Sequence, residues 1–355
     1  MSKSILKPIF NLNAELLDNI VKIKNIVSDL NNQKFSDLVL LDLEKDSYAV
    51  SAFASTSIEG NPLPLTDVKR LLKQKPEKVR DTEKEVLNYN KALEFLNTKI
   101  IKELKVKNGI IISKKSELKL SNDFICEIQS IVIEELLDKS NIGKFRKKPV
   151  IVNDPKKRQV AYIPPDAKDV NKLMEELVSF TQTEAKNIDP LILAGIFHKQ
   201  FVIIHPFMDG NGRTTRLVTK YLLASMGLDT FKLFSFENYY NKNVTNYFSK
   251  VGVLGDYYEI KDKINFTDWL IYFTGGIIDE LLRVQKILET TNVKRIEPHE
   301  QIILDFIKKN KSISKSEYEK ITDRKRSTQI LDFKRLVDKG MIKRENKGKA
   351  TYYTI

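Results

Sequence analysis

Hydrophobic residues recur at helical spacing along most of the chain. The segment 13–31 is the clearest case, with apolar residues on one stripe at intervals of three and four, which is typical of an amphipathic helix. Further segments follow the same rule, and several end at a glycine or before a proline. They are 45–59, 65–74, 80–100, 121–138, 168–182, 189–201, 213–226, 241–253 and 265–290. The pattern predicts a mainly α-helical fold.

One segment departs from this pattern. The apolar run Val150–Val152 leads into the turn sequence Asn153-Asp154-Pro155, and a second apolar run, Val160–Ile163, ends at Pro164-Pro165. Two short apolar runs around a turn signal are typical of a β-hairpin. We expect this hairpin over residues 149–163.

The last part of the chain has a pattern of its own, which restarts with a proline near 298. Residues 297–355 are predicted to form three helices and then two short strands, at 341–344 and 350–355, the order of a winged helix-turn-helix. In the third helix, 324–339, five apolar residues are expected to face inward. They are Ile330, Leu331, Phe333, Leu336 and Val337. The expected domains are 1–120 with an inhibitory helix at about 45–60, 121–290 as the catalytic core, and 297–355.

Composition narrows the class of protein. The 355 residues are too many for one compact domain, and 41% apolar with 30% charged residues excludes wholesale disorder. The single cysteine, Cys126, cannot form an internal disulfide, which favours a reducing compartment. We see neither a signal peptide nor a membrane-spanning stretch, so we expect a cytoplasmic protein without a membrane partner. With 60 Lys+Arg against 47 Asp+Glu, the net charge of +13 indicates an anionic partner of unspecified kind.

Candidate chemistry is concentrated in residues 205–216, HPFMDGNGRTTR. Gly210 and Gly212 precede a predicted helix, whose first N–H groups form an anion site that glycine allows a ligand to approach closely. Arg213 and Arg216 are three residues apart, so both guanidinium groups are expected on one face of the first turn. Two arginines beside free amides suit a polyphosphate.

Two further residues complete this site. Asp209 offers a hard oxygen ligand for the Mg²⁺ that a polyphosphate brings, and His205 can take a proton near neutral pH. Alone, a histidine is more often a structural core residue, and two arginines are often surface charge; their combination favours a site. The segment is neither a Walker-A loop nor a Rossmann fingerprint, because no Lys-Ser/Thr follows the glycines and a helical pattern precedes them.

This segment resembles, at every fixed position, the signature of the Fic family of protein adenylyltransferases, His-x-Phe-x-Asp/Glu-Gly-Asn-Gly-Arg-x-x-Arg. Gly143-x-x-Arg146 and the 150–163 hairpin resemble the family's flap, which aligns a target peptide by strand addition. Tyr247-Phe248 resembles a Tyr-Tyr pair near the nucleotide, with Phe248 as a departure. The resemblance covers roughly residues 40–290 and implies a Fic-type helical core with a β-hairpin flap.

The resemblance also implies a mechanism with ATP and Mg²⁺. His205 would deprotonate a Ser, Thr or Tyr hydroxyl of a target protein, which attacks the α-phosphate of ATP. Asn211 would hold the α-phosphate, Asp209 the metal, and the two arginines the departing phosphates. The residues expected to line the nucleotide site are Glu59, Val150, Ile151, Val152, Asn153, Asp209, Gly210, Asn211, Gly212, Arg213, Thr214, Thr215, Arg216 and Tyr247. For Tyr247, core packing is the alternative.

A second motif lies N-terminal to this core. Ser55-Thr56-Ser57-Ile58-Glu59-Gly60 resembles the Ser/Thr-x-x-x-Glu-Gly/Asn motif that inhibits one class of Fic proteins. Glu59 is expected to form a bidentate pair with Arg216, and Ser55 lies on the same helix face. An arginine held in this way cannot grip the γ-phosphate, so we expect autoinhibition. The alternative, an ordinary carboxylate at a helix C-terminus, is disfavoured by the helix dipole.

The basic excess divides between two surfaces. Residues 297–355 carry 15 Lys+Arg and nine Asp+Glu, which suits DNA phosphates, although winged helices also bind proteins. A second cluster flanks the hairpin, where an acidic target protein is the more natural partner. It consists of Lys144, Arg146, Lys147, Lys148, Lys156, Lys157 and Arg158. Self-modification and a homodimer are further expectations. The alternative functions are a DNA-binding regulator with a nucleotide-sensing core, and net removal of AMP from a modified target.

Overall fold

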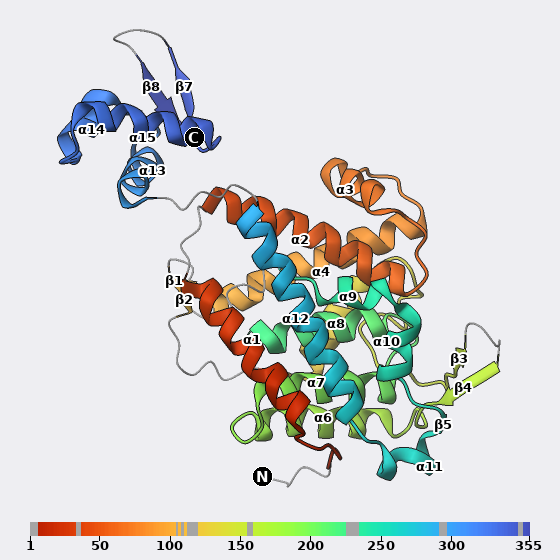
Figure 1. Cartoon of the computed structure of the whole chain (residues 1–355). Coiled ribbons are helices and arrows are strands. Elements are labelled where there is room, and N and C mark those ends of the chain that lie inside the picture. Colours follow the sequence, from red (N-terminus) through yellow and green to blue (C-terminus); the bar gives the residue numbers. More distant parts are fainter. Residues whose placement is uncertain are drawn as a thin grey trace. The chain divides into compact units, whose positions relative to one another are not determined.

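The computed structural model describes residues 6–32, 37–103, 106–107, 110–111, 120–154, 159–224, 234–290, 297–346 and 351–355. By compactness the chain divides into a core unit, Met1–Asn31 with Glu44–Leu282, and a C-terminal unit, Asn32–Leu43 with Arg283–Ile355. Helices dominate both (Figure 1), so the predicted mainly α-helical class is confirmed. Within the described ranges, no helix has the length and apolar character needed to cross a membrane.

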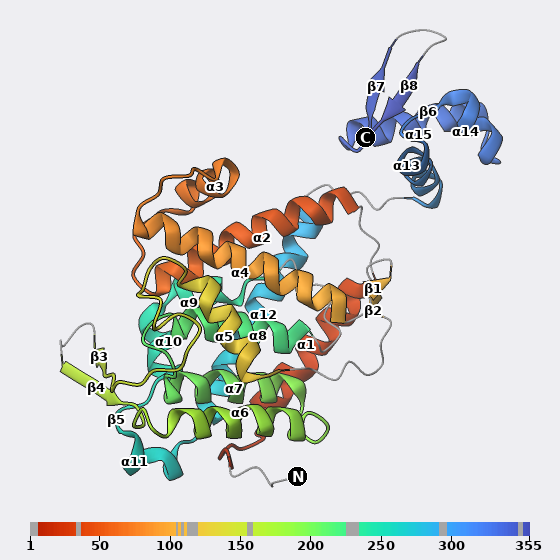
Figure 2. The same ribbon diagram turned by 180° about the vertical axis from the view of Figure 1, so that it is seen from behind.

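The core unit is built around two helices, α7 (Pro190–Ile204) and α8 (Asn211–Ala224). α8 packs against α7, α4 (Asp81–Glu103) and α5 (Asn122–Val132), as Figures 1 and 2 show. The other helices in this part of the chain are α1 (Ala14–Asn32), α2 (Asp37–Ile58), α3 (Leu65–Gln74), α6 (Val170–Glu184), α9 (Phe236–Lys242), α10 (Val244–Val251), α11 (Tyr257–Ile260) and α12 (Thr267–Thr290).

The composition of α7 explains its central position. Its sequence, PLILAGIFHKQFVII, is apolar on nearly every side and almost all of it is buried, as expected for a helix of this kind. Asp189 caps the helix by accepting a hydrogen bond from Leu191 N (2.9 Å), and Pro190 occupies the first helical position. A firmly packed α7 therefore leads directly into His205.

Three predicted helices differ most from the structure in their limits. α2 begins at Asp37 rather than at 45. α5 ends at Val132 rather than at 138, where Asn88 of α4 donates from Nδ2 to Glu134 O (2.8 Å) and holds the chain in a turn. The helix predicted for 241–253 is divided between α9 and α10 at Asn243, because the Asn243 side chain accepts from Asn246 N (3.0 Å) and caps α10.

The predicted hairpin is confirmed. β3 (Val152–Asp154) pairs antiparallel with β4 (Gln159–Ile163), and β4 also pairs in parallel with β5 (Gly255–Asp256), a strand that the pattern did not predict. The buried Tyr162 of β4 packs with Ile203 of α7, so the base of the hairpin is anchored to the core. The predicted turn at Pro155 and three members of the basic cluster, Lys156, Lys157 and Arg158, lie outside the described residues. A further short strand pair is β1 (Val106–Lys107) with β2 (Ile110–Ile111).

The C-terminal unit contains the three predicted helices, α13 (Pro298–Asn310), α14 (Lys315–Ile321) and α15 (Arg326–Asp338). Its strands lie in the order β6 (Ile313–Ser314), β8 (Tyr352–Thr354) and β7 (Lys343–Glu345), so β6 joins the two predicted strands. The assignment of this unit as a winged helix, and the division into three domains, stay predictions.

One part of the predicted orientation of α15 is wrong. Ile330 and Leu331 are 48% and 53% exposed instead of facing inward. The buried stripe of the helix is formed by Gln329, Asp332, Phe333 and Leu336. Asp332 takes an inward position because basic side chains surround it there.

Candidate functional site

The loop with the signature residues connects the two central helices. His205 directly follows α7 in the left-handed region (φ 51°, ψ 60°), while its N–H still bonds Phe201 O (3.0 Å). A non-glycine residue in this region is strained and persists only where its surroundings determine it. Phe207 has no exposed surface, and its ring centroid lies 5.3 Å from that of Phe145 and 6.1 Å from that of Phe201. Phe207 therefore anchors the loop in the core.

Asn211 closes this loop on itself. Its Oδ1 accepts from Phe207 N and its Nδ2 donates to Phe207 O, both at 2.8 Å. Both ends of the side-chain amide are engaged by the loop backbone, and the predicted contact of Asn211 with an α-phosphate stays a prediction. What the position offers to a ligand is its own N–H at the start of α8.

The N-terminus of α8 is shaped by two glycines. Gly210 has a φ of 78°, and a Cβ there would lie 2.8 Å from Ile133 Cγ2. Gly212 lies against the side chain of Glu59, since a Cβ at 212 would collide with Glu59 Oε1 and stand 3.0 Å from Arg216 Nη1. The Glu59 carboxylate therefore occupies the end of α8 at which an anion binds favourably.

Arg216 is fully buried and contacts the end of α2. Its Nη2 donates to Glu59 Oε1 (2.7 Å) and to Ser55 O (2.9 Å), and its Nε donates to Ser55 Oγ (2.8 Å). The predicted Arg216–Glu59 contact is thus present, but the predicted bidentate geometry is wrong, because Ser55 engages Nε and leaves Nη2 for the carboxylate. Burial lowers the pKa of Arg216, but Glu59 and two neighbouring tyrosines outweigh this and hold it above its usual range.

The way in which α2 ends fixes the position of Glu59. Gly60 adopts a φ of 94°, which ends the helix as predicted. One turn earlier than Ser55, Ser51 Oγ accepts from Lys220 Nζ of α8 (2.8 Å). Two serines on one face of α2 therefore accept from two buried cations of α8.

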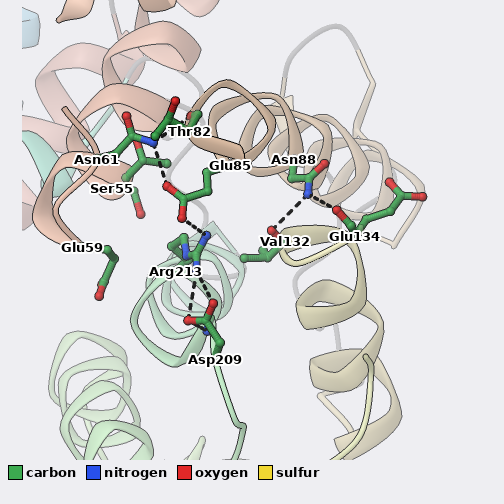
Figure 3. Close-up of polar contacts among 12 residues, drawn as sticks. Ser55, Glu59, Asn61, Thr82, Glu85, Asn88, Val132, Glu134, Asp209 and Arg213 are labelled. Carbon is green, nitrogen blue, oxygen red and sulfur yellow. Dashed lines mark hydrogen bonds and ion pairs between the residues drawn. The ribbon is translucent and has the colours of Figure 1, made fainter. Parts of the chain in front are cut away.

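Arg213 is directed to other carboxylates (Figure 3). Its Nη2 lies 3.1 Å from both carboxylate oxygens of Asp209, and its Nη1 lies 3.6 Å from Glu85 Oε1 of α4. Asn61, just beyond α2, donates from Nδ2 to Glu85 Oε2 (2.7 Å). The two arginines therefore contact different acids. The sequence pattern missed Glu85 and Asn61, because no spacing rule connects α4 with the signature.

Both arginines retain N–H groups without a hydrogen bond to the described part of the protein. Arg213 is 3% exposed and Arg216 is 0% exposed. Within the described part of the chain, Arg213 Nε, Arg213 Nη1, Arg216 Nη1 and Thr214 Oγ1 are buried without a hydrogen-bond partner. Unsatisfied buried donors are costly, and their grouping at a helix N-terminus indicates an anionic ligand. The facing carboxylates are between 28% and 49% exposed, so a phosphate can replace them.

His205 is placed to accept a proton. Its Nδ1 lies 3.4 Å from Val202 O, and a proton on Nδ1 leaves Nε2 free for a substrate. Burial lowers the pKa of His205; Arg146 acts in the same direction, while Val202 O, Glu59 and Asp209 act against it. The net lowering keeps the imidazole neutral at pH 7, which a general base requires.

Asp209 is the residue in this site that is able to hold a metal ion. Its side chain is 49% exposed and is now paired with Arg213. Among the described residues, no group of three or more His, Cys, Asp or Glu is arranged around a common metal position. Proteins commonly hold Mg²⁺ through one or two carboxylates together with substrate phosphates. Asp209 therefore fits a Mg²⁺ ion that arrives with a nucleotide.

Tyr247 lies in the core next to the buried Arg216. It is 1% exposed, its ring stacks on Tyr240 with centroids 4.5 Å apart, and its hydroxyl lies 3.1 Å from His198 Nε2. Core packing therefore accounts for its ring, and its predicted contact with nucleotide stays a prediction. Thr215 is similarly enclosed and donates to Asn211 O within α8 (2.7 Å).

The hairpin residues predicted to line the nucleotide site divide into two sets. Val152 packs against the buried Tyr162. Ile151 and Asn153 are exposed, and Val150 is half-buried. Alternate residues of a strand point to opposite faces, so Val152 supports the hairpin while Ile151 and Asn153 remain accessible to a ligand.

Comparison with known families agrees with this geometry. Residues 119–223, which include α5, the hairpin, α7 and most of α8, match the family model of the Fic/DOC family. The chain therefore carries a Fic domain, and the resemblance drawn from the signature is confirmed.

Relatives extend this match beyond the domain. The chain is 26% identical over 234 residues to "Protein adenylyltransferase Fic" of Drosophila mojavensis and 28% identical over 233 residues to the protein of the same name in Aedes aegypti. These matches cover 61% and 60% of this chain. They cover 42% of each relative, so the chain spans less than half the length of these curated proteins.

Solved structures share the fold. A Fic family protein from Desulfovibrio desulfuricans G20 gives a TM-score of 0.63 over 99% of this chain and 98% of its own, at 18% identity. A Fic domain-containing signaling protein from Bacteroides thetaiotaomicron VPI-5482 gives 0.59 over 78% of this chain and 98% of its own, at 19% identity. The likeness thus concerns the arrangement of the helices rather than the sequence.

Proposed function

We propose that the chain transfers AMP from ATP to a hydroxyl group of a protein. The observation that carries this proposal is a pair of buried arginines with unpartnered N–H groups beside a neutral histidine, at the N-terminus of one helix. Arginines and helix N–H groups bind phosphates, and a neutral imidazole activates a hydroxyl. The relatives in Drosophila mojavensis and Aedes aegypti, both called protein adenylyltransferases, support the same reaction.

The reaction requires one proton transfer and one displacement at phosphorus. His205 Nε2 takes the proton of the hydroxyl as its oxygen bonds to the α-phosphorus of ATP. The bond from the α-phosphorus to the bridging oxygen of the β-phosphate breaks, and pyrophosphate leaves. Arg213 and Arg216 stabilise the charge that develops on the leaving phosphates. The proton on His205 returns to solvent after the products leave.

Asp209 is the proposed ligand of Mg²⁺, which when bound neutralises phosphate charge. In this role Asp209 gives up its contacts with Arg213 Nη2, now 3.1 Å long. Glu85, held by Asn61, remains near Arg213. Arg213 thereby keeps one carboxylate while its other donors become available for phosphate.

Glu59 is proposed to inhibit this reaction. Its carboxylate lies against Gly212 at the anion-binding end of α8 and accepts from Arg216 Nη2. It therefore competes with a phosphate both for the helix N-terminus and for the guanidinium. Ser55 holds the same arginine through Nε. Release of the end of α2 would free Arg216 for the γ-phosphate.

The test is the transfer of label from α-labelled ATP with Mg²⁺ to protein, followed by mass spectrometry of the modified residue. Glu59→Gly is expected to raise labelling of the chain itself about tenfold or more, because a charge-assisted contact of about 1.5–3 kcal/mol no longer holds Arg216. His205→Ala in that background is expected to lower the rate by about 10²–10⁴-fold. Glu77→Gln changes an exposed carboxylate outside the site and serves as the matched control.

Each outcome separates the alternatives. Equal labelling of wild type and Glu59→Gly would contradict the inhibition, and labelling that survives His205→Ala would contradict the general base. ATP binding without transfer in every variant would favour nucleotide sensing. Release of AMP from a previously modified protein would indicate the reverse reaction.

The hairpin is the proposed docking site of the target protein. β3 is an edge strand in the order β3-β4-β5, so one side of its backbone can pair with an extended peptide. Lys144, Lys147 and Lys148 are exposed in the segment before it and favour an acidic target. The single cysteine supports a reducing location such as the cytoplasm. A homodimer stays a prediction.

The C-terminal unit is a candidate DNA-binding element because the outer face of α15 combines cations with apolar side chains. Arg326 and Lys334 are exposed there beside Ile330 and Leu331. Cations suit phosphates, and apolar side chains suit thymine methyl groups in the major groove. Two other arginines of this unit, Arg324 and Arg335, pair with the buried Asp332.

Retention of the full chain on duplex DNA tests this second function. Lys334→Glu is expected to weaken binding and to lower its salt dependence by about one phosphate contact. Lys172→Glu, an exposed lysine on α6, is the charge-matched control. Binding that does not depend on salt, or equal loss in both variants, would contradict a DNA contact through α15.

A further inference from the structure

We propose that Arg146, assisted by Gln129, is a positioning residue that holds the loop 205–210 and aims His205 at the substrate hydroxyl. This inference rests on the proposed AMP transfer. It also removes Arg146 from the basic surface at which the sequence pattern had placed it, since the residue is 3% exposed.

Arg146 binds the loop through an unusually complete set of contacts. Among the described residues, its hydrogen-bond partners are backbone oxygens, and all three side-chain nitrogens take part. They are His205 O from Nε (2.8 Å), Pro165 O and Ile204 O from Nη2 (2.5 and 3.4 Å), Lys148 O from Nη1 (3.2 Å), and Pro206 O from the backbone N–H (2.8 Å). One planar group therefore joins the loop to the segment that follows the hairpin.

Two of these contacts bear directly on the conformation of His205. The carbonyls of Ile204 and His205 belong to the two peptide planes on either side of the His205 Cα, and Arg146 bonds both. The rotation between these planes sets the φ of 51° and ψ of 60°. Left-handed backbone at a non-glycine residue is unfavourable and needs external support. Arg146 supplies that support and thereby fixes the direction of the imidazole.

Gln129 of α5 holds the other end of the loop. It has no exposed surface; its Nε2 donates to Asp209 O (3.2 Å) and its Oε1 accepts from Gly143 N (2.7 Å). The segment 143–146 is therefore tied to both ends of the loop, at His205 through Arg146 and at Asp209 through Gln129. Neither contact is visible from local spacing, because the partners lie 59 and 80 residues apart.

Arg146 also influences the protonation of His205. The charged groups that act on the imidazole are Glu59 from α2, Asp209 from the loop and Arg146 itself. Both carboxylates raise the pKa of His205 and Arg146 lowers it, in the same direction as burial. Loss of the guanidinium charge would therefore favour the imidazolium. The acid limb of the pH–rate profile, where the rate falls as His205 becomes protonated, would then move to higher pH.

Replacement by lysine and by glutamine separates geometry from charge. In the Glu59→Gly background, Arg146→Lys keeps the charge but cannot bond several carbonyls in one plane, so the rate at saturating ATP is expected to fall about tenfold with an unchanged acid limb. Arg146→Gln loses both, so we expect a fall of about 100-fold and an acid limb shifted upward by about half to one pH unit. The KM for ATP should change less than the rate, because Arg146 does not contact the phosphate site. Arg70→Gln, an arginine with 67% side-chain exposure on α3, is the matched control.

A second readout keeps this inference distinct from the proposed function. The pKa of His205 is measured by NMR titration of the three histidines in wild type and in Arg146→Gln, with no reaction required. If the Glu59→Gly parent transfers no AMP, the proposed function fails, while a raised His205 pKa in Arg146→Gln still supports the charge effect and an unchanged pKa overturns it.

The geometric part has its own critical outcomes. Parental rates in Arg146→Lys, or an effect confined to the KM for ATP, would overturn the positioning role. If Arg146→Gln does not fold, Gln129→Leu tests the other end of the loop in a chain that retains Arg146. We expect a rate several-fold lower, with an unchanged acid limb of the pH–rate profile. A rate equal to that of Glu59→Gly would overturn the positioning role of Gln129.

Discussion

Buried charge is arranged in opposite ways at the candidate site of the core unit and in the C-terminal unit. At the candidate site the buried members are cations, Arg213 and Arg216, and their carboxylate partners are between 28% and 49% exposed. In the C-terminal unit the buried members are carboxylates, Glu300 and Asp332, neither of which has exposed surface. Their cationic partners are Arg324, Arg335 and Lys339, and His299 Nε2 lies 3.2 Å from Asp332 Oδ1.

The difference indicates which cluster can receive a ligand. The core arginines can exchange partly exposed carboxylates for a phosphate. Asp332, by contrast, accepts from Arg335 Nη2 (2.8 Å) and Tyr318 OH (3.1 Å) inside a closed cluster. A buried acid that many donors share cannot leave without a large desolvation cost for its partners. The first arrangement suits binding and the second suits folding.

The largest expected effect concerns the cluster around Asp332 in the C-terminal unit. Asp332→Ala leaves several cations and the Tyr318 hydroxyl without their shared acceptor, so the C-terminal unit should lose about 3–5 kcal/mol of stability. Urea titration of the full chain, followed by hydrogen exchange of α13–α15, measures the loss. Asp338→Ala, an exposed acid at the end of the same helix, is the control. Equal exchange in both variants would show that the buried acid does not organise this unit.

The next effect concerns Arg216 at the candidate site. In the Glu59→Gly background, Arg216→Gln should raise the KM for ATP about ten- to 100-fold, which corresponds to about 1.5–3 kcal/mol for hydrogen bonds to a charged group. Initial rates across a range of ATP concentrations measure it, with Arg70→Gln as the control. An unchanged KM, or a loss of folding comparable to that of Asp332→Ala, would make Arg216 a structural cation and remove the contrast between the units.

A smaller effect is expected from Ser55→Ala. The change removes the acceptor of Arg216 Nε and leaves Glu59 in place, so about 1 kcal/mol of the inhibitory contact is lost and labelling should rise about fivefold over wild type. This rise should stay below that of Glu59→Gly. Ser57→Ala, at a half-buried position on the same helix, should label like wild type. Labelling at or below wild type in Ser55→Ala would limit the inhibition to the carboxylate.

The smallest effect is expected on the outer face of α15. Ile330→Ser should change the free energy of unfolding by at most about 0.5 kcal/mol, because the side chain is 48% exposed. Leu336→Ala, at a fully buried position of the same helix, should cost about 2–5 kcal/mol. Denaturant titration compares the two. A loss above about 1 kcal/mol in Ile330→Ser would indicate that this side chain is buried on the inward face of the helix.

Local spacing was sufficient for much of the candidate site. The glycines at 210 and 212 and the arginines that follow lie within two turns, so the helix repeat and the free N–H groups define an anion site without any distant contact.

The order of residues by itself determined the helical class, the hairpin, the end of α2 near Gly60 and the chemistry of the loop. Each depends on a periodic pattern or on groups a few residues apart. Only the tertiary structure decided that Arg146 lies inside, that the Glu59 carboxylate covers Gly212, and that Asp332 replaces Ile330 on the inner face of α15. Each of these arrangements depends on contacts between segments far apart in the chain; Arg216 and Glu59, for example, are separated by 157 residues. Each balances the desolvation of a charge against the hydrogen bonds it gains, and no local pattern encodes that balance.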